Sequence, residues 1–230
     1  MHIRDLIQFL TELSENNNRA WFAMNRPRYD ILRGEFLALV SGLITEIAVF
    51  DPPVAACDPK KALFRINRDM RFSKDKKPYK TTFSASILPN GRKKPSEGGG
   101  PVYYFMINAA AQLQFGVGEY APPPLRLRAI RNQIAADTQG FGKLLKERKL
   151  RAAFGGFHDE GKLTRPPKGF AADLPHIEQI KLKNFFVWKE SELNRDVPEE
   201  ATATLLAGFR DAYALVAWLR AVAPSEQCPI

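Results

Sequence analysis

Apolar positions recur with helical spacing through the first part of the chain. Ile3, Leu6, Ile7, Leu10 and Leu13 lie three or four residues apart along one face, which predicts an amphipathic helix. A second stripe predicts a longer helix that begins near residues 25–27 and ends at Asp51, where two prolines follow. The buried positions expected for this longer helix are Tyr29, Leu32, Phe36, Leu39, Leu43, Ile47 and Phe50.

The spacing changes to that of β-strands in the middle of the chain. Residues 63–67 and 81–87 alternate between apolar and polar positions, residues 102–107 form a continuous β-type run, and residues 112–117 alternate again. Four such runs joined by turn-forming residues predict an antiparallel sheet. The longest connection, residues 89–101, contains an Asn-Gly pair and three consecutive glycines, and is expected to be an exposed loop.

Helical spacing returns in the last third. Apolar stripes predict helices around residues 127–134 and 141–145, then a short helix near 175–182, a strand at 185–188 and a final helix from Pro198. The final helix is expected to bury Leu205, Leu206, Phe209, Tyr213, Val216 and Leu219. The order helices, strands, helices predicts an α+β protein, residues 1–230 forming a single domain in which a central antiparallel sheet of about four to six strands is packed by N-terminal and C-terminal helices.

The basic residues are unevenly distributed along the chain. The 230 residues are 45% hydrophobic and 26% charged, which is typical of a globular protein and excludes a disordered chain. The formal net charge is +9, but twelve basic and two acidic residues lie between Lys60 and Lys94, so the excess positive charge is concentrated in the segment 60–94. This segment is therefore the first place to look for an anionic partner.

The remaining composition predicts a cytoplasmic protein without a cofactor. Two cysteines, Cys57 and Cys228, are too few for a disulfide framework and lack a zinc-binding spacing. The N-terminal residues carry charges within what would have to be the apolar part of a secretory signal, and no apolar run is long enough to span a membrane. We therefore expect no membrane association, no metal and no cofactor.

Two catalytic patterns occur in a context that does not support them. Residues 156–162 match the first part of a phosphate-binding P-loop, but Leu163 follows where a Ser or Thr is needed and two acidic residues lie inside, so a surface turn is predicted instead. Ser73 and Lys76 match a Ser-x-x-Lys pair, but Pro78 disfavours the helix that this chemistry requires. No nucleophile with a general base can be assigned, and catalysis stays an open question.

The segment from Arg65 to Lys80 combines arginines with aromatic residues. Arg65 lies on the polar face of a predicted strand, and Arg68 and Arg71 follow as the chain leaves it. Arginine is suited to bidentate contacts with phosphate or carboxylate groups, so these three residues favour an anion-binding role. For the lysines a solvated, lysine-rich loop is the better interpretation. Asp69 is expected to pair with the neighbouring arginines as a charge anchor and not to donate a proton.

The same segment resembles the signature R-I-x-R-D-x-R-F-S-K-D-K-x-P-Y-K of a family of conserved hypothetical proteins (a domain of unknown function) found in bacteria and some fungi. Further similar boxes are residues 17–22 (N-N-R-x-W-F), 58–60 (D-P-K), 116–122 (a glycine-aromatic-proline turn) and 167–170 (P-K-G-F), with Arg131 in the helix between the last two. The resemblance covers nearly the whole chain and implies no established activity. A histidine expected after the paired tyrosines 103–104 is absent here, which argues against a histidine-dependent reaction.

Together the boxes predict a ligand-binding site with cationic, aromatic and small polar groups. Its members are Trp21, Arg65, Arg68, Asp69, Arg71, Ser73, Lys74, Lys76, Tyr79, Lys80 and Lys168. These residue types suit an anionic small molecule with a planar part, phosphate- or nucleotide-like. Two alternatives stay open: nucleic-acid binding through the basic segment 60–94, although no helix-turn-helix, RRM or zinc-finger signature is present, and a noncatalytic interaction module for an acidic protein partner.

Overall fold

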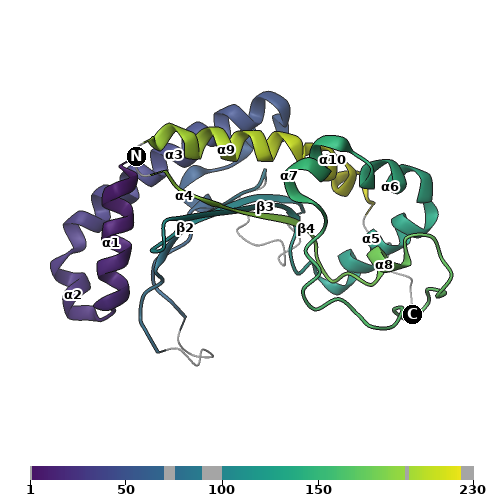
Figure 1. Cartoon of the computed structure of the whole chain (residues 1–230), viewed down its shortest axis with the longest axis horizontal. Helices are drawn as coiled ribbons and strands as arrows, with labels where there is room; N and C mark the ends of the chain where they lie inside the picture. The colour runs from purple at the N-terminus through teal and green to yellow at the C-terminus, as the bar shows by residue number, and fades with distance from the viewer. Residues whose placement is uncertain (1, 70–75, 90–99, 195–196, 224–230) are drawn as a thin grey trace. The chain divides into compact units, whose positions relative to one another are not determined.

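The computed structural model of the chain describes residues 2–69, 76–89, 100–194 and 197–223 (Figure 1). Its helices and strands follow one another in an order that confirms the predicted α+β class. The chain divides into two compact units. The first comprises residues 1–91, 104–115 and 190–207, and the second comprises residues 92–103, 116–189 and 208–230. The single domain expected from the sequence stays a prediction.

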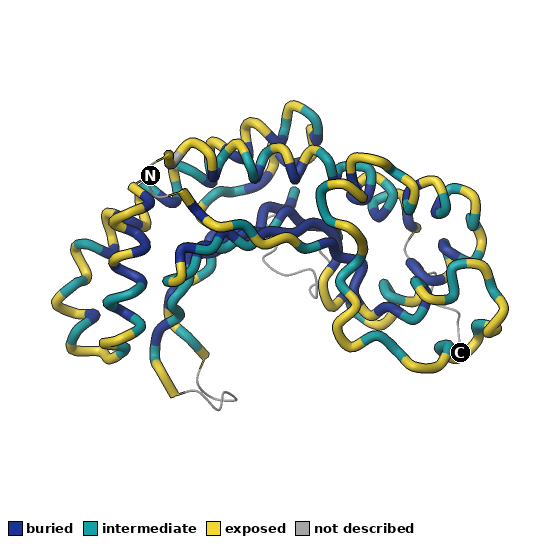
Figure 2. The backbone as a smooth tube through the Cα atoms, in the orientation of Figure 1, coloured by how far each residue is buried: buried dark blue, intermediate teal, exposed yellow. Residues whose placement is uncertain are grey.

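One antiparallel sheet has its four strands in sequence order. The strands are β1 (Thr82–Ile87), β2 (Val102–Asn108), β3 (Gln112–Glu119) and β4 (Phe185–Glu192). Asn108 organises the turn between β2 and β3, because its side-chain oxygen accepts hydrogen bonds from the backbone N–H groups of Ala110 and Gln112 at 2.9 and 3.1 Å. Most strand positions are buried, as Figure 2 shows. The predicted sheet is therefore confirmed.

The helices of the first unit are α1 (Ile3–Glu15), α2 (Arg19–Met24), α3 (Arg26–Phe50) and α4 (Pro59–Ala62), with a 3₁₀ helix, η1 (Pro52–Ala56), before α4. Helix α3 packs on the sheet through Phe36, whose ring lies 5.4 Å from the rings of both Phe83 and Phe105. The three rings are almost completely buried. They form an aromatic core that joins the predicted long helix to strands β1 and β2.

The helices of the second unit are α5 (Pro124–Ala136), α6 (Thr138–Leu145), α7 (Arg148–Phe154), α8 (Ile177–Ile180) and α10 (Tyr213–Ala221). Phe141 of α6 is fully buried, with ring centroids 5.0 Å from Trp218 and 6.3 Å from Phe157. Helix α9 (Pro198–Asp211) begins in the first unit and ends in the second.

Four details differ from the predictions. Residues 63–67 form no strand but two isolated bridges, Leu63 with Ala85 and Asn67 with Tyr79. The final helix is divided at Ala212 into α9 and α10, and helix α7 was not predicted. Leu39, Phe50, Leu206 and Tyr213 are half-buried rather than buried. For residues 63–67 and for the final helix, the expected regular spacing fails because the chain bends at residue 66 and turns at residue 212.

Within the described residues, no helix has both the length and the apolarity needed to cross a membrane.

Candidate functional site

The signature segment folds back on itself as a hairpin base. The N–H of Arg68 donates to the carbonyl of Pro78 at 2.9 Å, and the N–H of Lys80 donates to the carbonyl of Ile66 at 2.8 Å. These two bonds flank the Asn67–Tyr79 pair, which is the spacing of an antiparallel ladder. The chain between the two arms includes residues 70–75, which lie outside the described residues.

The base of this hairpin is attached to the N-terminal helices by Asn17. Its side-chain N–H donates to the carbonyl of Tyr79 at 3.0 Å, and its side-chain oxygen accepts from the N–H of Tyr79 at 3.0 Å. The Tyr79 ring stacks on Phe22 of α2, with centroids 4.1 Å apart and an interplanar angle of 18°. Asn18 caps α2 by accepting from the N–H of Trp21 at 2.9 Å. The N-N-R-x-W-F box and the P-Y-K end of the signature therefore contact each other directly. We call this contact of Asn17 and Phe22 with Tyr79 the joint.

A cation–aromatic cluster of Phe64, Lys80 and Tyr104 lies on the other face of the hairpin base, and Arg68 shares this face with Lys80. Side chains alternate along paired strands, so Arg68 and Lys80 point away from the face on which Tyr79 meets Phe22. The Lys80 ammonium lies 5.4 Å from the centroid of Phe64, whose ring meets Tyr104 edge-on at 6.1 Å. All four are half-buried, and burial raises the pKa of the Tyr104 hydroxyl.

The structure brings some of the predicted site residues together. Arg65, Asp69 and Lys76 are exposed on the hairpin, where Arg68 and Lys80 are half-buried. Trp21 is half-buried, with its ring 5.7 Å from Phe9. Three predicted members lie outside the described residues: Arg71, Ser73 and Lys74.

Tyr79 has a different environment from the one expected of a ligand-stacking residue. It is 8% exposed and its ring is engaged by Phe22. We therefore infer that Tyr79 positions the hairpin, and that the aromatic ring beside the Lys80 cation is that of Phe64, which Tyr104 contacts edge-on.

Lys168 lies in the second unit, whereas the other described candidates lie in the first. Its box forms an exposed turn in which the N–H of Phe170 donates to the carbonyl of Pro167 at 3.1 Å. Gly169 has φ +92°, a conformation that favours glycine and explains its place in the box.

Other positions that carry the resemblance have packing roles in the second unit. A side chain at Gly116 would collide with the Phe186 ring, and one at Gly118 with the carbonyl of Phe185. Arg131 is 9% exposed and donates to the carbonyl of Leu182 at 2.9 Å, and burial lowers its pKa. These residues therefore support the contact between strands β3 and β4 and the attachment of helix α5.

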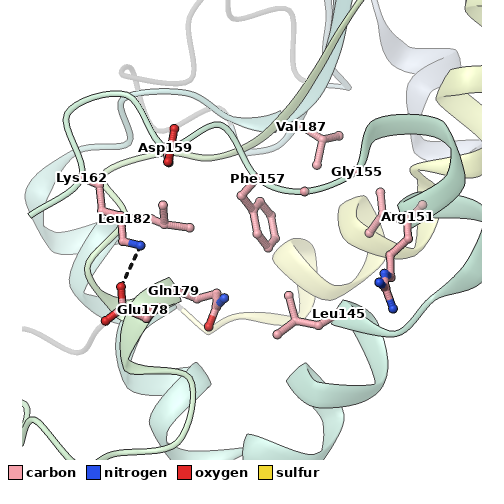
Figure 3. A pocket seen from close by; sticks show the side chains of 12 residues that line it. Leu145, Arg151, Gly155, Phe157, Asp159, Lys162, Glu178, Gln179, Leu182 and Val187 are labelled. Carbon is pink, nitrogen blue, oxygen red and sulfur yellow. Dashed lines mark ion pairs between the residues drawn. The ribbon is translucent and has the colours of Figure 1, made fainter.

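The second unit also contains a cavity of about 370 Å³ that no sequence motif indicated (Figure 3). It lies between helices α7 and α8, strand β4 and residues 155–162. The last of these is the segment with the incomplete P-loop pattern, and the structure confirms the predicted turn, with the N–H of Lys162 donating to the carbonyl of Asp159 at 2.9 Å.

The fold and this hairpin define a class: an α+β protein in which a basic signature segment is fastened to an N-terminal helical pair. The chain belongs to the family of conserved hypothetical proteins designated DUF2461, whose model matches residues 5–218. No curated protein and no solved structure matches the chain.

Proposed function

We propose that this protein binds an anionic, phosphate- or nucleotide-like small molecule at the cation–aromatic cluster, with the exposed Arg65 nearby in the chain. The observation that carries the proposal is the attachment of the hairpin base. Two ladder bonds and the two Asn17 bonds fix the backbone that bears Arg68 and Lys80. Cations held on a fixed backbone bind an anion with a smaller entropy cost than cations on a mobile loop.

The aromatic members suit a ligand with a planar part. Phe64 and Tyr104 are half-buried, Phe64 lies beside the Lys80 ammonium, and Tyr104 meets the Phe64 ring edge-on. Stacking on an aromatic ring together with a charge-assisted hydrogen bond to phosphate is the usual way to hold a nucleotide-like molecule. The proposal concerns binding alone and assigns no reaction. It includes a cytoplasmic location, where nucleotides are abundant and the buried thiol of Cys57 stays reduced.

Titration calorimetry with ATP, inorganic phosphate and uncharged adenosine tests the proposal. ATP and phosphate are expected to bind, and adenosine to bind far more weakly. Lys80→Met should weaken ATP binding by about tenfold, the value of one charge-assisted hydrogen bond. Lys61→Met is the matched control, because Lys61 is exposed on α4, outside the cluster. Equal losses in the two variants, or equal binding of ATP and adenosine, would contradict the proposal.

Nucleic-acid binding and binding of an acidic protein, the two alternative functions, predict different results. If nucleic acid is the ligand, a single-stranded oligonucleotide binds with affinity that falls steeply as salt is added, while ATP does not bind. If an acidic protein is the partner, replacing Arg65, Arg68 and Arg71 together by alanine abolishes its capture, while neither ATP nor the oligonucleotide binds.

A further inference from the structure

The cavity of the second unit has an apolar wall and a charged rim. Leu150, Leu182 and Val187 are nearly inaccessible to solvent. The half-buried Phe157 ring lies between Leu182 and Val187 on one side and Leu145 on the other (Figure 3). At about 370 Å³ the cavity has the size of a small-molecule site. Its wall therefore suits the hydrocarbon or aromatic body of a small ligand.

The charged side chains on the rim differ in whether they have an ion-pair partner. Lys162 is ion-paired with Glu178 at 2.8 Å, and Lys181 pairs with the other oxygen of Glu178 at 2.7 Å. Among the residues that the structure describes, Arg151 has no ion-pair or hydrogen-bond partner for its guanidinium. Arg151 is therefore the lining cation whose guanidinium is free to pair with a ligand anion.

The charged side chains at the two ends of the cavity are different. Figure 3 shows Arg151 on one side of Phe157, and Asp159 and the Lys162–Glu178 pair on the other. A ligand anion that lies next to Arg151 places its apolar body over Phe157, toward the carboxylate of Asp159. A second anionic group at the far end of the ligand would meet this like charge.

We propose that the cavity is a binding site for a small monocarboxylate with an apolar or aromatic body. Its carboxylate pairs with Arg151, its body packs against Phe157 and the leucines, and Asp159 selects against dicarboxylates. The site lies within the second unit and is independent of the anion-binding function proposed for the hairpin.

Four probes test this proposal by NMR, with the backbone N–H signals of Gly155 and Gly156 as reporters at the cavity. We expect 4-phenylbutyrate to shift these signals, 4-phenylbutyramide to bind at least tenfold more weakly, and 1,4-phenylenediacetate to bind more weakly than its monoacid counterpart, phenylacetate. Arg151→Ala should weaken 4-phenylbutyrate binding by about tenfold.

Arg148→Ala is the matched control, since Arg148 is exposed on the same helix and does not line the cavity. Asp159→Asn supplies the second measurement, because it should bring the affinity for 1,4-phenylenediacetate close to that for phenylacetate. Equal binding of the acid and the amide, equal losses in Arg148→Ala and Arg151→Ala, or no shift with any probe would overturn the proposal. Both arginines are exposed, so thermal unfolding should be unchanged in both variants.

Discussion

Asn17 pairs with the backbone of Tyr79 across 62 positions of sequence, through two hydrogen bonds of 3.0 Å each. The amide of an asparagine offers a donor and an acceptor side by side, and here it completes the unpaired edge of the hairpin as a neighbouring strand would. The ring stacking of Tyr79 on Phe22 adds apolar contact at the same place. The joint explains why an asparagine box and a Pro-Tyr-Lys sequence occur together in one chain.

Replacing Asn17 with alanine should destabilise the protein by about 1–3 kcal/mol, because the N–H and carbonyl of the buried Tyr79 lose their partner. Asn16→Ala is the control, since the Asn16 side chain is exposed and donates to the Glu12 carbonyl of its own helix at 3.0 Å. Denaturant unfolding of the two variants measures the difference. If the two are equally stable, the joint does not hold the hairpin.

The sequence predicted the regular elements around this joint but not the contact that forms it. Helix α1 and strands β1 to β3 were predicted because their periodicity is local and each buries one continuous face. That Tyr79 meets Phe22 was not predictable, since a tyrosine beside lysines looks the same whether its ring faces a ligand or another element. The stacking role expected for Tyr79 followed from composition, whereas its burial follows from tertiary packing.

The cavity of the second unit was missed for a related reason. Arg151, Phe157, Glu178 and Val187 come from four separate segments, so no spacing in the sequence relates them. Residues 156–162 match only part of the P-loop pattern, since Leu163 follows where a Ser or Thr is needed. This mismatch excluded a phosphate-binding loop. It gave no reason to expect that the same turn forms one wall of an apolar cavity.

Glycines on α3 and β3 should respond to alanine in opposite ways. Gly34 and Gly42 lie on α3, where an added side chain meets open space, so alanine should stabilise the protein by about 0.5–1 kcal/mol at each position. Gly118 has φ +124° and lies against the carbonyl of Phe185. Gly118→Ala should therefore destabilise by more than about 1 kcal/mol. Thermal unfolding checks both signs, and a neutral Gly118→Ala variant would show that β3 and β4 pack more loosely than described.

Arg126 and Glu119 form a buried ion pair that also ends helix α10. The guanidinium donates to Glu119 at 2.6 Å, to the carbonyl of Leu219 at 2.6 Å and to that of Val222 at 2.8 Å. The side chain of Glu119 is 1% exposed, so removing its partner leaves a charge out of water. Arg126→Ala should cost about 3–5 kcal/mol.

The exposed Arg128 on the same helix is the matched position, and Arg128→Ala should change the free energy of unfolding by less than about 0.5 kcal/mol. Replacing Glu119 and Arg126 together by leucine and methionine should cost less than Arg126→Ala, since no unpaired charge remains. Urea unfolding of the three variants measures these differences. A double variant that is less stable than the single one would contradict this account.

Glu178 gives the clearest pH dependence. Hydrogen bonds from Lys162, then from Lys181, lower the pKa of its carboxyl from 4.5 to about 2. A carboxyl whose folded pKa is depressed stabilises the folded state above its unfolded pKa, so this contribution is complete above about pH 4.5 and is lost as the pH falls toward 2. In Glu178→Gln that part of the acid dependence of the folding stability should disappear.

Carboxyl NMR titration should show the pKa of Glu178 rising toward 4.5 in Lys162→Ala. The pKa should be unchanged in the control Lys183→Ala, which removes an exposed lysine from the same region. A pKa that stays near 2 in Lys162→Ala would mean that the Lys162 ion pair at the cavity rim is not formed in solution.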